Sequence, residues 1–274
     1  MLAYVSRVGQ DRVDRYFRRE AAFWDEIYVG SDVYALIHQQ RRERALRWID
    51  GLGLPRGARV LEVGCGAGHT AIALARRGFD VDATDAVDAM VELAQARVSE
   101  AEPELQLRVS RADAQQLPFD DGTFDAALAL GVIPWLPDPP AALRELARVV
   151  RPGGCVVLNA DNRSRLTHLL DPARNPKLVP LQEAIRRARG RGESSDPGTT
   201  LHSRREFGRL LAAAGLTVER SETLGFGQFT LLGRRVVPAR AGVRLHRGLQ
   251  QLADRGVPVV RATGAQYLVL ARRA

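Results

Sequence analysis

With 274 residues, of which 45% are hydrophobic and 26% charged, the chain is long enough to bury a core as one large domain or two small ones. It has no apolar run near the roughly 18 residues of a membrane-spanning helix, and its first ten residues lack the apolar stretch of a secretory signal. The formal charge of +8 comes almost entirely from arginine, whereas a nucleic-acid surface typically mixes lysine and arginine with stacking aromatics. Since Cys65 and Cys155 form neither a disulfide framework nor a metal cluster, we expect a cytoplasmic protein without a metal or a nucleic-acid partner.

The N-terminal part, residues 11–50, is predicted to be helical. Ser31-Asp32 offers an N-cap, and the apolar residues that follow recur at roughly helical spacing: Tyr34, Ile37, Leu46 and Ile49. Glycines and a proline in 51–57 end this region. We interpret residues 1–57 as an N-terminal helical lid.

From residue 58 the chain alternates short apolar runs with helical segments. The pattern predicts strands at 59–63, 80–84, 105–109, 124–130 and 155–158. It predicts helices at 69–77, at 87–98 and after the cap residue Asp138, the last one ended by Pro152-Gly153-Gly154. Such alternation is typical of βαβ units, so we expect residues 58–162 to form a parallel sheet covered by helices on both faces.

The alternation stops after Asp161. Residues 163–202 are polar and rich in Pro, Gly and Arg, which predicts an insertion. A helix at 203–214 and strands at 217–222 and 266–270 then complete the sheet, and a basic segment, 228–262, lies between these two strands. The prediction is a single α/β domain spanning residues 1–274.

The strongest chemical signal is the run from Val60 to Gly68, in which a strand delivers Glu62 to a loop with glycines at 64, 66 and 68. Glycine permits a sharp turn and a close ligand, and the helix that follows presents free N–H groups. Dinucleotide-binding oxidoreductases use a related loop, but that fingerprint needs Gly or Ala at the position of His69. The carboxylate of Glu62 would also repel a pyrophosphate. It suits a cationic ligand such as S-adenosylmethionine (SAM).

Two further carboxylates follow predicted strands. Asp85 ends the second strand, where a carboxylate can accept both hydroxyls of a ribose, whereas Asp82 points to the opposite face if the register holds. Asp113 follows the third strand and suits an adenine amine, although an exposed loop acid is the simpler alternative.

The run from Val60 to Asp161 resembles the class I SAM-dependent methyltransferase family, in particular its menaquinone/ubiquinone-type and natural-product branch. The matching segments are 60–68, Asp85, 111–114, 119–121, 124–125, 130–136, 145–146 and 151–154. The resemblance implies a Rossmann-like fold with a seven-stranded, mostly parallel sheet whose last strand is antiparallel. It implies that SAM, with S-adenosyl-L-homocysteine as its product, contacts Glu62, Gly64, Gly66, Asp85, Asp113, Ala114 and Leu130. We add their neighbours Cys65, Gly68, Ala86, Met90 and Trp135 to this expected cofactor set.

The acceptor is less defined by the sequence. Enzymes of this fold that methylate exocyclic amino groups place an Asn/Asp-Pro-Pro-aromatic motif after the fourth strand, where this chain has Leu130-Gly131-Val132-Ile133. We therefore expect O- or C-methylation of a secondary metabolite, a quinone or a lipid-like small molecule. A nucleic-acid methyltransferase, a nicotinamide-dependent oxidoreductase and a non-catalytic SAM-binding protein are the alternatives.

A hydroxyl acceptor benefits from a general base, and His38 and His202 are the candidate acid/base residues. Aromatic residues of the lid can wall the substrate, namely Tyr16, Trp24 and Tyr28, together with Trp135 after the fourth strand. Packing of the lid onto the sheet explains the three lid aromatics equally well.

The basic segment 228–262 holds seven arginines against one acid, Asp254. Its leucines at 245, 249 and 252 share one helical face, which allows contact with an anionic membrane or a lipid-like acceptor. A helix packed on the core with a solvated basic face is the plainer interpretation. The oligomeric state is left open by the sequence.

Overall fold

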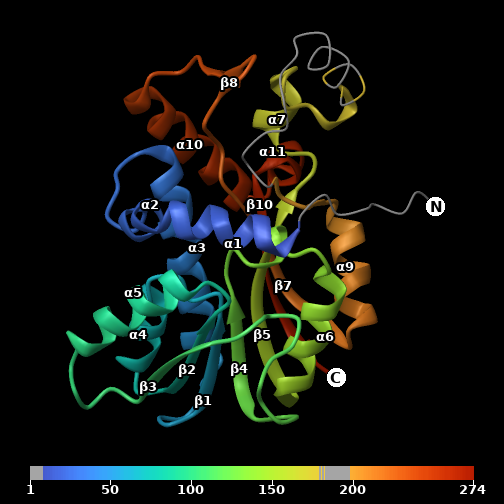
Figure 1. The fold of residues 1–274 in the computed structure, drawn as a ribbon. Helices are drawn as coiled ribbons and strands as arrows, with labels where there is room; N and C mark the ends of the chain where they lie inside the picture. Colours follow the sequence, from blue (N-terminus) through green and yellow to red (C-terminus); the bar gives the residue numbers. More distant parts are fainter. Residues whose placement is uncertain (1–8, 179, 181, 183–197) are drawn as a thin grey trace.

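The computed structural model describes residues 9–178, 180, 182 and 198–274 of the chain. Its centre is one sheet in the order β3-β2-β1-β4-β5-β10-β7 (Figure 1). The strands span Arg59–Val63 (β1), Asp80–Asp85 (β2), Leu107–Arg111 (β3), Phe124–Ala129 (β4), Val150–Asn162 (β5), Leu216–Leu224 (β7) and Gln266–Arg273 (β10). Strands β1 to β5 are parallel neighbours, and β10 is antiparallel to both β5 and β7. The expected seven-stranded, mostly parallel sheet is confirmed, with a two-residue strand, β6 (Leu201–His202), added beside β5.

Side chains that alternate along the strands point to opposite faces of the sheet and form two separate hydrophobic cores. One core includes Leu61, Val156 and Val269 under α6 (Pro139–Val149) and α9 (Arg204–Ala213). The other includes Val60 and Leu128 under α3 (Val33–Asp50), α4 (His69–Ala75) and α5 (Asp88–Ser99). A sheet buried on both faces needs apolar side chains at every position of its central strands.

The helix starts follow the predicted caps. The carboxylates of Asp32 and Asp138 accept from the backbone N–H groups of Ala35 and Ala141, at the starts of α3 and α6. Ser203 and Glu206 form a reciprocal capping box at the start of α9.

The predicted helical region 11–50 is helical and consists of three helices, α1 (Gln10–Arg19), α2 (Ala21–Glu26) and α3, separated by turns. The predicted start of the fifth strand was wrong. Strand β5 begins at Val150 and not at Cys155. Phe124 of β4 pairs with Val150 and Ala126 pairs with Cys155, so Pro152-Gly153-Gly154 forms a bulge inside the strand and does not precede it.

The lid and both insertions gather beyond the carboxyl ends of the parallel strands. Helix α1 crosses this edge, and α7 (Leu166–Leu170), the hairpin β8–β9 (Thr230–Leu231 and Arg234–Arg235), α10 (Ala239–Asp254) and α11 (Pro258–Thr263) lie further out (Figure 1). A 3-10 turn, Pro176–Leu178, follows α7. Within the predicted insertion 163–202, residues 179, 181 and 183–197 lie outside the described residues. No described helix is long and apolar enough to span a membrane.

Candidate functional site

A cavity of about 1260 Å³ lies at the carboxyl ends of β1, β2, β4 and β5. Its floor is formed by the loops that follow these strands, and its walls are formed by α1, α2, α3 and both insertions. In open α/β sheets this edge is where ligands bind, because the strand order reverses there and neighbouring loops diverge.

The glycine loop after β1 has the backbone that the sequence predicts. Gly64, Gly66 and Gly68 have φ values of +68°, +53° and +82°, in the left-handed region that glycine adopts without strain. A Cβ atom on Gly64 would lie 2.3 Å from Cγ2 of Val132, whereas one on Gly66 would meet nothing within 4 Å. Gly64 is therefore needed for close packing, and Gly66 leaves the backbone open to the cavity. Gly68 does not line the cavity; it caps α4.

Glu62 places a buried carboxyl group against this loop. Its side chain lines the cavity, it is 3% exposed, and its Oε2 atom has no hydrogen-bond partner in the part of the chain that the structure describes. Burial raises the pKa of Glu62 to about 8, and the positive charge of Arg42 and a hydrogen bond from Thr70 only partly oppose this effect. A cationic ligand beside Oε2 would restore the ionised form.

Asp82 and Asp85 of β2 lie on opposite faces of the sheet. Asp85 lines the cavity and accepts from the N–H groups of Gly66 and Val87, both at 3.0 Å. Asp82 pairs with Arg108 at 2.8 Å and Arg59 at 3.2 Å and does not line the cavity. Burial raises the pKa of Asp85, and its backbone hydrogen bonds oppose that rise.

The other predicted cofactor residues form one side of the cavity. Met90, Ala114 and Leu130 are buried, as is Cys65, and Ala86 follows Asp85 along the wall. Asp113 also lines the cavity, but it is exposed and its Oδ1 atom accepts from the N–H of Gln115 at 2.8 Å. A hydrogen-bonded loop acid at the rim is therefore what the structure shows at this position.

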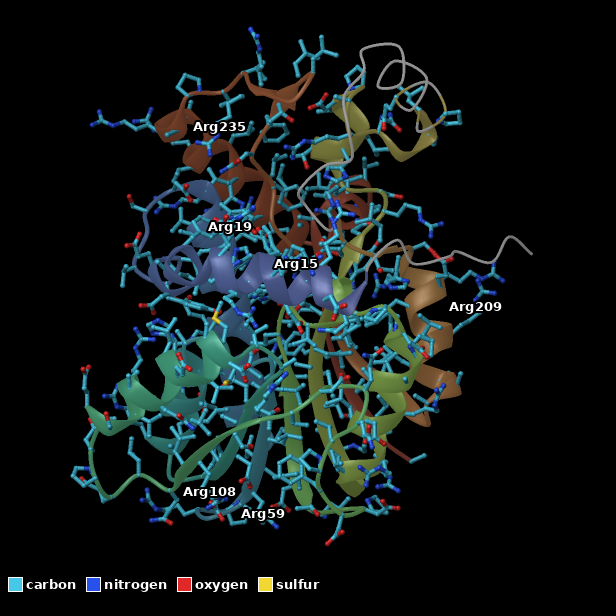
Figure 2. The ribbon with its side chains drawn as sticks, in the orientation of Figure 1. Arg15, Arg19, Arg59, Arg108, Arg209 and Arg235 are labelled. Atoms are coloured by element: carbon cyan, nitrogen blue, oxygen red, sulfur yellow. The ribbon has the colours of Figure 1, made fainter. Side chains whose placement is uncertain are left out.

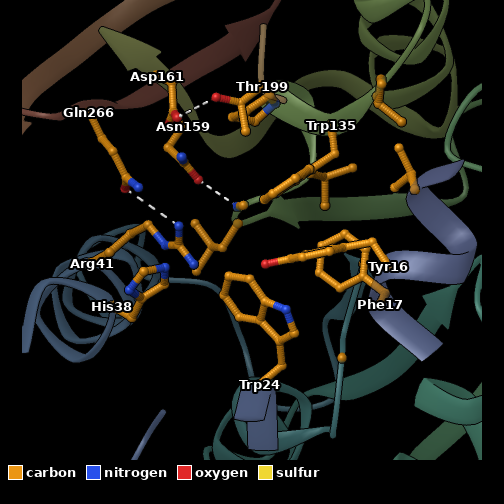
Figure 3. Close-up of a pocket in the computed structure, with 18 of the residues that line it drawn as sticks. Tyr16, Phe17, Trp24, His38, Arg41, Trp135, Asn159, Asp161, Thr199 and Gln266 are labelled. Carbon is orange, nitrogen blue, oxygen red and sulfur yellow. Dashed lines mark hydrogen bonds between the residues drawn. The ribbon is translucent and has the colours of Figure 1, made fainter. Parts of the chain in front are cut away.

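Sequence reasoning missed the polar end of the cavity, which Figure 3 shows. Arg41 on α3 is 4% exposed, and its guanidinium has no carboxylate within ion-pair distance among the described residues; its NH1 group contacts Oε1 of Gln266 at 3.4 Å. Asn159 on β5 accepts from the N–H of Gly131 at 2.6 Å, and its own amide nitrogen, buried, has no partner in the described chain. Two residues that line the cavity thus keep a buried donor nitrogen without an acceptor in the described chain, Nε of Arg41 and the amide nitrogen of Asn159. Nothing in the sequence distinguishes Arg41 from its neighbours, because only the fold turns it inward.

His38 lies one helical turn before Arg41 on the same face of α3. Its Nδ1 atom is 2.9 Å from the carbonyl oxygen of Tyr34, so Nδ1 carries the proton in the neutral ring and Nε2 is left as an acceptor. Burial, aided by the positive charge of Arg41, lowers the pKa of His38 to about 3.

Aromatic rings wall the cavity opposite this polar end. Tyr16 stacks on Trp135 with ring centroids 5.4 Å apart, and Phe17 contacts the same indole edge-on at 5.1 Å. Trp24 lies 6.4 Å from Trp135 and 5.7 Å from His38. These rings come from α1, α2 and the loop after β4, so the lid and the sheet share one aromatic cluster (Figure 3).

The lid is also fastened to the glycine loop by an ion-pair network. Asp25 on α2 contacts His69 at 3.0 Å and Arg97 at 2.6 Å. Tyr28, which lines the cavity, lies over His69 with a centroid distance of 5.0 Å.

His202 is not brought to the cavity. It lies on β6 and is buried, with its ring 5.7 Å from that of Phe207, and it does not line the cavity that its neighbour Leu201 does line.

Among the arginines labelled in Figure 2, Arg59 and Arg108 lie at the end where the parallel strands begin, and Arg235 lies at the opposite end. They are spread over several elements.

Comparison with known proteins finds similarity to a family in the core of the chain. Residues 61–158 match the family model described as "Methyltransferase domain". The chain is 37% identical over 128 residues to the ubiquinone biosynthesis O-methyltransferase of Paracidovorax citrulli, covering 46% of this chain and 52% of that one. It is 41% identical over 105 residues to an uncharacterized protein of Mycobacterium tuberculosis, covering 38% of this chain and 37% of that one. The chain spans about half the length of the first curated relatives it matches.

Solved structures match over nearly the whole chain. A magnesium protoporphyrin IX methyltransferase from Synechocystis with bound SAH has a TM-score of 0.66 and 18% identity, covering 97% of this chain and all of that one. The [4+2]-cyclase SpnF has a TM-score of 0.60 and 19% identity, covering all of this chain and 97% of that one. At such identities the likeness shows the fold, and a cyclase among the matches shows that this fold serves more than one chemistry.

Proposed function

We propose that the protein is a class I methyltransferase that binds SAM and transfers its methyl group to a small-molecule acceptor, because residues 61–158 match the methyltransferase-domain family model. The observation that carries the proposal is the buried carboxyl group of Glu62, a residue that lines the cavity beside an open glycine loop and whose Oε2 atom has no hydrogen-bond partner among the described residues. A positively charged ligand of the size of SAM satisfies this oxygen, and a pyrophosphate does not.

The residues around the cavity fit the parts of SAM. We assign the loop 64–68 and Glu62 to the methionine side, Asp85 with Ala86 to the ribose, and Asp113, Ala114, Met90 and Leu130 to the adenine. Cys65 and Trp135 complete the walls. Asp85 keeps acceptor capacity for ribose hydroxyls, since each of its oxygens takes one backbone hydrogen bond and has a second lone pair.

Arg41 and Asn159 are assigned to the carboxylate of the methionine part. A buried guanidinium without a counter-ion is costly, and a ligand carboxylate supplies that counter-ion. Once its positive charge is balanced by this carboxylate, Arg41 would lower the pKa of His38 less. We therefore infer that His38 becomes a stronger base when the cavity is filled.

When bound, SAM supplies a methyl group on a sulfonium, which an acceptor nucleophile displaces in line. The protein orients the acceptor and excludes water, because Tyr16, Trp24, Tyr28 and Trp135 surround the space that the acceptor would occupy. His38 offers Nε2 to take the proton of a hydroxyl acceptor, as expected for O-methylation. His202 is left out of this proposal, because it does not line the cavity.

The volume of the cavity favours an enzyme over a protein that only holds SAM. Pockets for one small ligand have volumes of roughly 300–1,000 Å³, and about 1260 Å³ leaves room for an acceptor beside the donor. We propose an O- or C-directed acceptor of the quinone, secondary-metabolite or lipid-like class.

Calorimetric titration with SAM, S-adenosylhomocysteine and NADH tests the first step. Binding of the first two and not of NADH is the expected result, and preference for NADH would favour the oxidoreductase alternative. Incubation with methyl-labelled SAM and an extract of the source cells then tests transfer, with mass spectrometry to find the labelled acceptor. Tight SAM binding without any labelled product would favour the non-catalytic alternative.

A further inference from the structure

The hairpin β8–β9 presents large apolar side chains to solvent at the outer end of the molecule. Leu231, Leu232 and Val236 are 50%, 69% and 55% exposed, and almost every residue of 231–241 is exposed. A folded protein leaves such side chains together on one tip only at an energetic cost, so a cluster of this kind marks a surface that meets another apolar phase.

The tip is held in place by a buried carboxylate. Asp171, which is fully buried after α7, accepts from the N–H groups of Leu232 at 2.8 Å and Gly233 at 3.1 Å, and from the hydroxyl of Thr230. Leu232 has a φ of +52°, a left-handed conformation that is unfavourable for leucine. These hydrogen bonds fix the turn in the conformation that points its two leucines outward.

The surroundings of the tip are basic. No Asp or Glu occurs in residues 223–253. Arg234, Arg235 and Arg240 are exposed, as are Arg244 and Arg247 on α10, and none of these five forms an ion pair with a described residue. Arg235 lies at the same end of the molecule as the label of β8 (Figures 1 and 2). Exposed leucines ringed by unpaired arginines complement an anionic surface that has an apolar interior.

We propose that the β8–β9 tip docks this protein on an anionic phospholipid bilayer, with Leu231 and Leu232 inserted and the arginines on the headgroups. A nucleic-acid surface fits less well, because none of the residues of 230–241 is aromatic and stacking rings are what single strands need. An acidic protein would be matched by the arginines alone and would leave the exposure of Leu231 and Leu232 unexplained.

The position of the tip deepens the proposed function. Ala173 and Arg174, next to Asp171, line the cavity, as do Gly227 and Gln228 just before β8. A tip in the bilayer would bring this wall of the cavity to the membrane surface, which selects an acceptor that is dissolved in lipid. This choice of acceptor rests on the proposed methyltransferase function, whereas the docking itself does not.

Vesicle co-sedimentation with the full chain tests the docking. The vesicles are phosphatidylcholine alone and phosphatidylcholine with 30% phosphatidylglycerol, at low and at physiological salt. We expect binding to the anionic vesicles only, weakened by salt. Arg234→Gln/Arg235→Gln should lower the partition coefficient about 25-fold at low salt, since each arginine near the surface contributes about fivefold. Leu231→Ser/Leu232→Ser should lower it about tenfold or more at either salt concentration.

Matched controls come from exposed residues elsewhere. Arg205→Gln/Arg209→Gln on α9 removes the same charge, and Val218→Ser on β7 removes a 41% exposed apolar group. Both controls should bind vesicles as the wild type does, and all variants should keep the wild-type SAM affinity. No vesicle binding by the wild type, or equal losses in hairpin and control variants, would overturn the proposal. So would RNA that displaces the protein from vesicles through the same arginines with no contribution from the leucines. Because SAM affinity is measured on the same proteins, failure of docking is distinguishable from failure of the proposed function.

Discussion

We predict that Glu62 lowers the stability of the ligand-free protein near neutral pH and strengthens the binding of SAM. Burial raises the pKa of this group to about 8 in the folded protein, compared with 4.5 in its ordinary state. The unfolded chain therefore loses the proton first. Between these two pKa values the folded state binds more protons, so its stability falls as the pH rises through that window. Linkage with these values gives a loss of about 2 kcal/mol between pH 6 and pH 8.

The variant Glu62→Gln keeps the shape of the side chain and removes its titration. Urea unfolding of both ligand-free proteins at pH 6, 7 and 8 measures their free energies of unfolding. The difference between variant and wild type should shift by about 2 kcal/mol in favour of the variant from pH 6 to pH 8. The two proteins share all five histidines, whose own titrations cancel in the difference. The variant should also bind SAM about tenfold or more weakly, because a charged hydrogen-bond acceptor becomes neutral.

Parallel stability curves for the two proteins would refute the reasoning, since Glu62 would then be ionised in the folded protein throughout. A variant that gains stability at pH 8 and still binds SAM as tightly as the wild type would show that Glu62 is buried but does not contribute to SAM binding.

Four other predictions follow from the cavity and its surroundings. Asp85→Ala should weaken SAM binding at least about tenfold, whereas Asp82→Ala should leave the Kd unchanged and cost about 1 kcal/mol of stability; equal Kd values for both variants would contradict the facing of β2. Arg41→Met should weaken calorimetric binding of SAM about tenfold but not that of decarboxylated SAM, and equal losses for the two would remove the carboxylate assignment. His38→Ala should lower the single-turnover rate with a hydroxyl acceptor about 100-fold at an unchanged SAM Kd, and an unchanged rate would exclude it as the base. Asp171→Ala should destabilise the protein by about 2 kcal/mol and open residues 230–235 to limited proteolysis, whereas an intact hairpin would show that other contacts hold it.

Most of the parallel core could be predicted because strands such as β1 and β4 are short, largely apolar and bounded by turn residues. Strand β1 was predicted to the residue, and β2 to within one. Strand β3 is shifted by two residues from its predicted position, since its pairing with β2 runs from Leu107, opposite Val81, to Arg111, opposite Asp85. This register is set by the neighbouring strand, and the local sequence pattern of β3 does not contain that information.

The residues of the site were likewise predictable only in part. The glycine loop and Asp85 lie at the ends of consecutive strands of one βαβ unit, and both line the cavity. Arg41 and Asn159 are 118 residues apart and meet only through the packing of α3 against the sheet, so no spacing could connect them. His202 was a candidate base because histidine is the usual general base, but the pairing of β6 with β5 puts it beside Phe207.

The aromatic cluster gives the protein a built-in optical reporter. Of the three tryptophans of the protein, Trp24 and Trp135 line the cavity, and Trp48, on α3, is buried in the core. A ligand that displaces water from the first two, or parts the stacked ring of Tyr16 from Trp135, changes the emission of two indoles while the third stays constant. Intrinsic fluorescence can therefore follow occupancy in real time without a label, and replacement of Trp48 by phenylalanine would leave a signal that comes from the cavity alone.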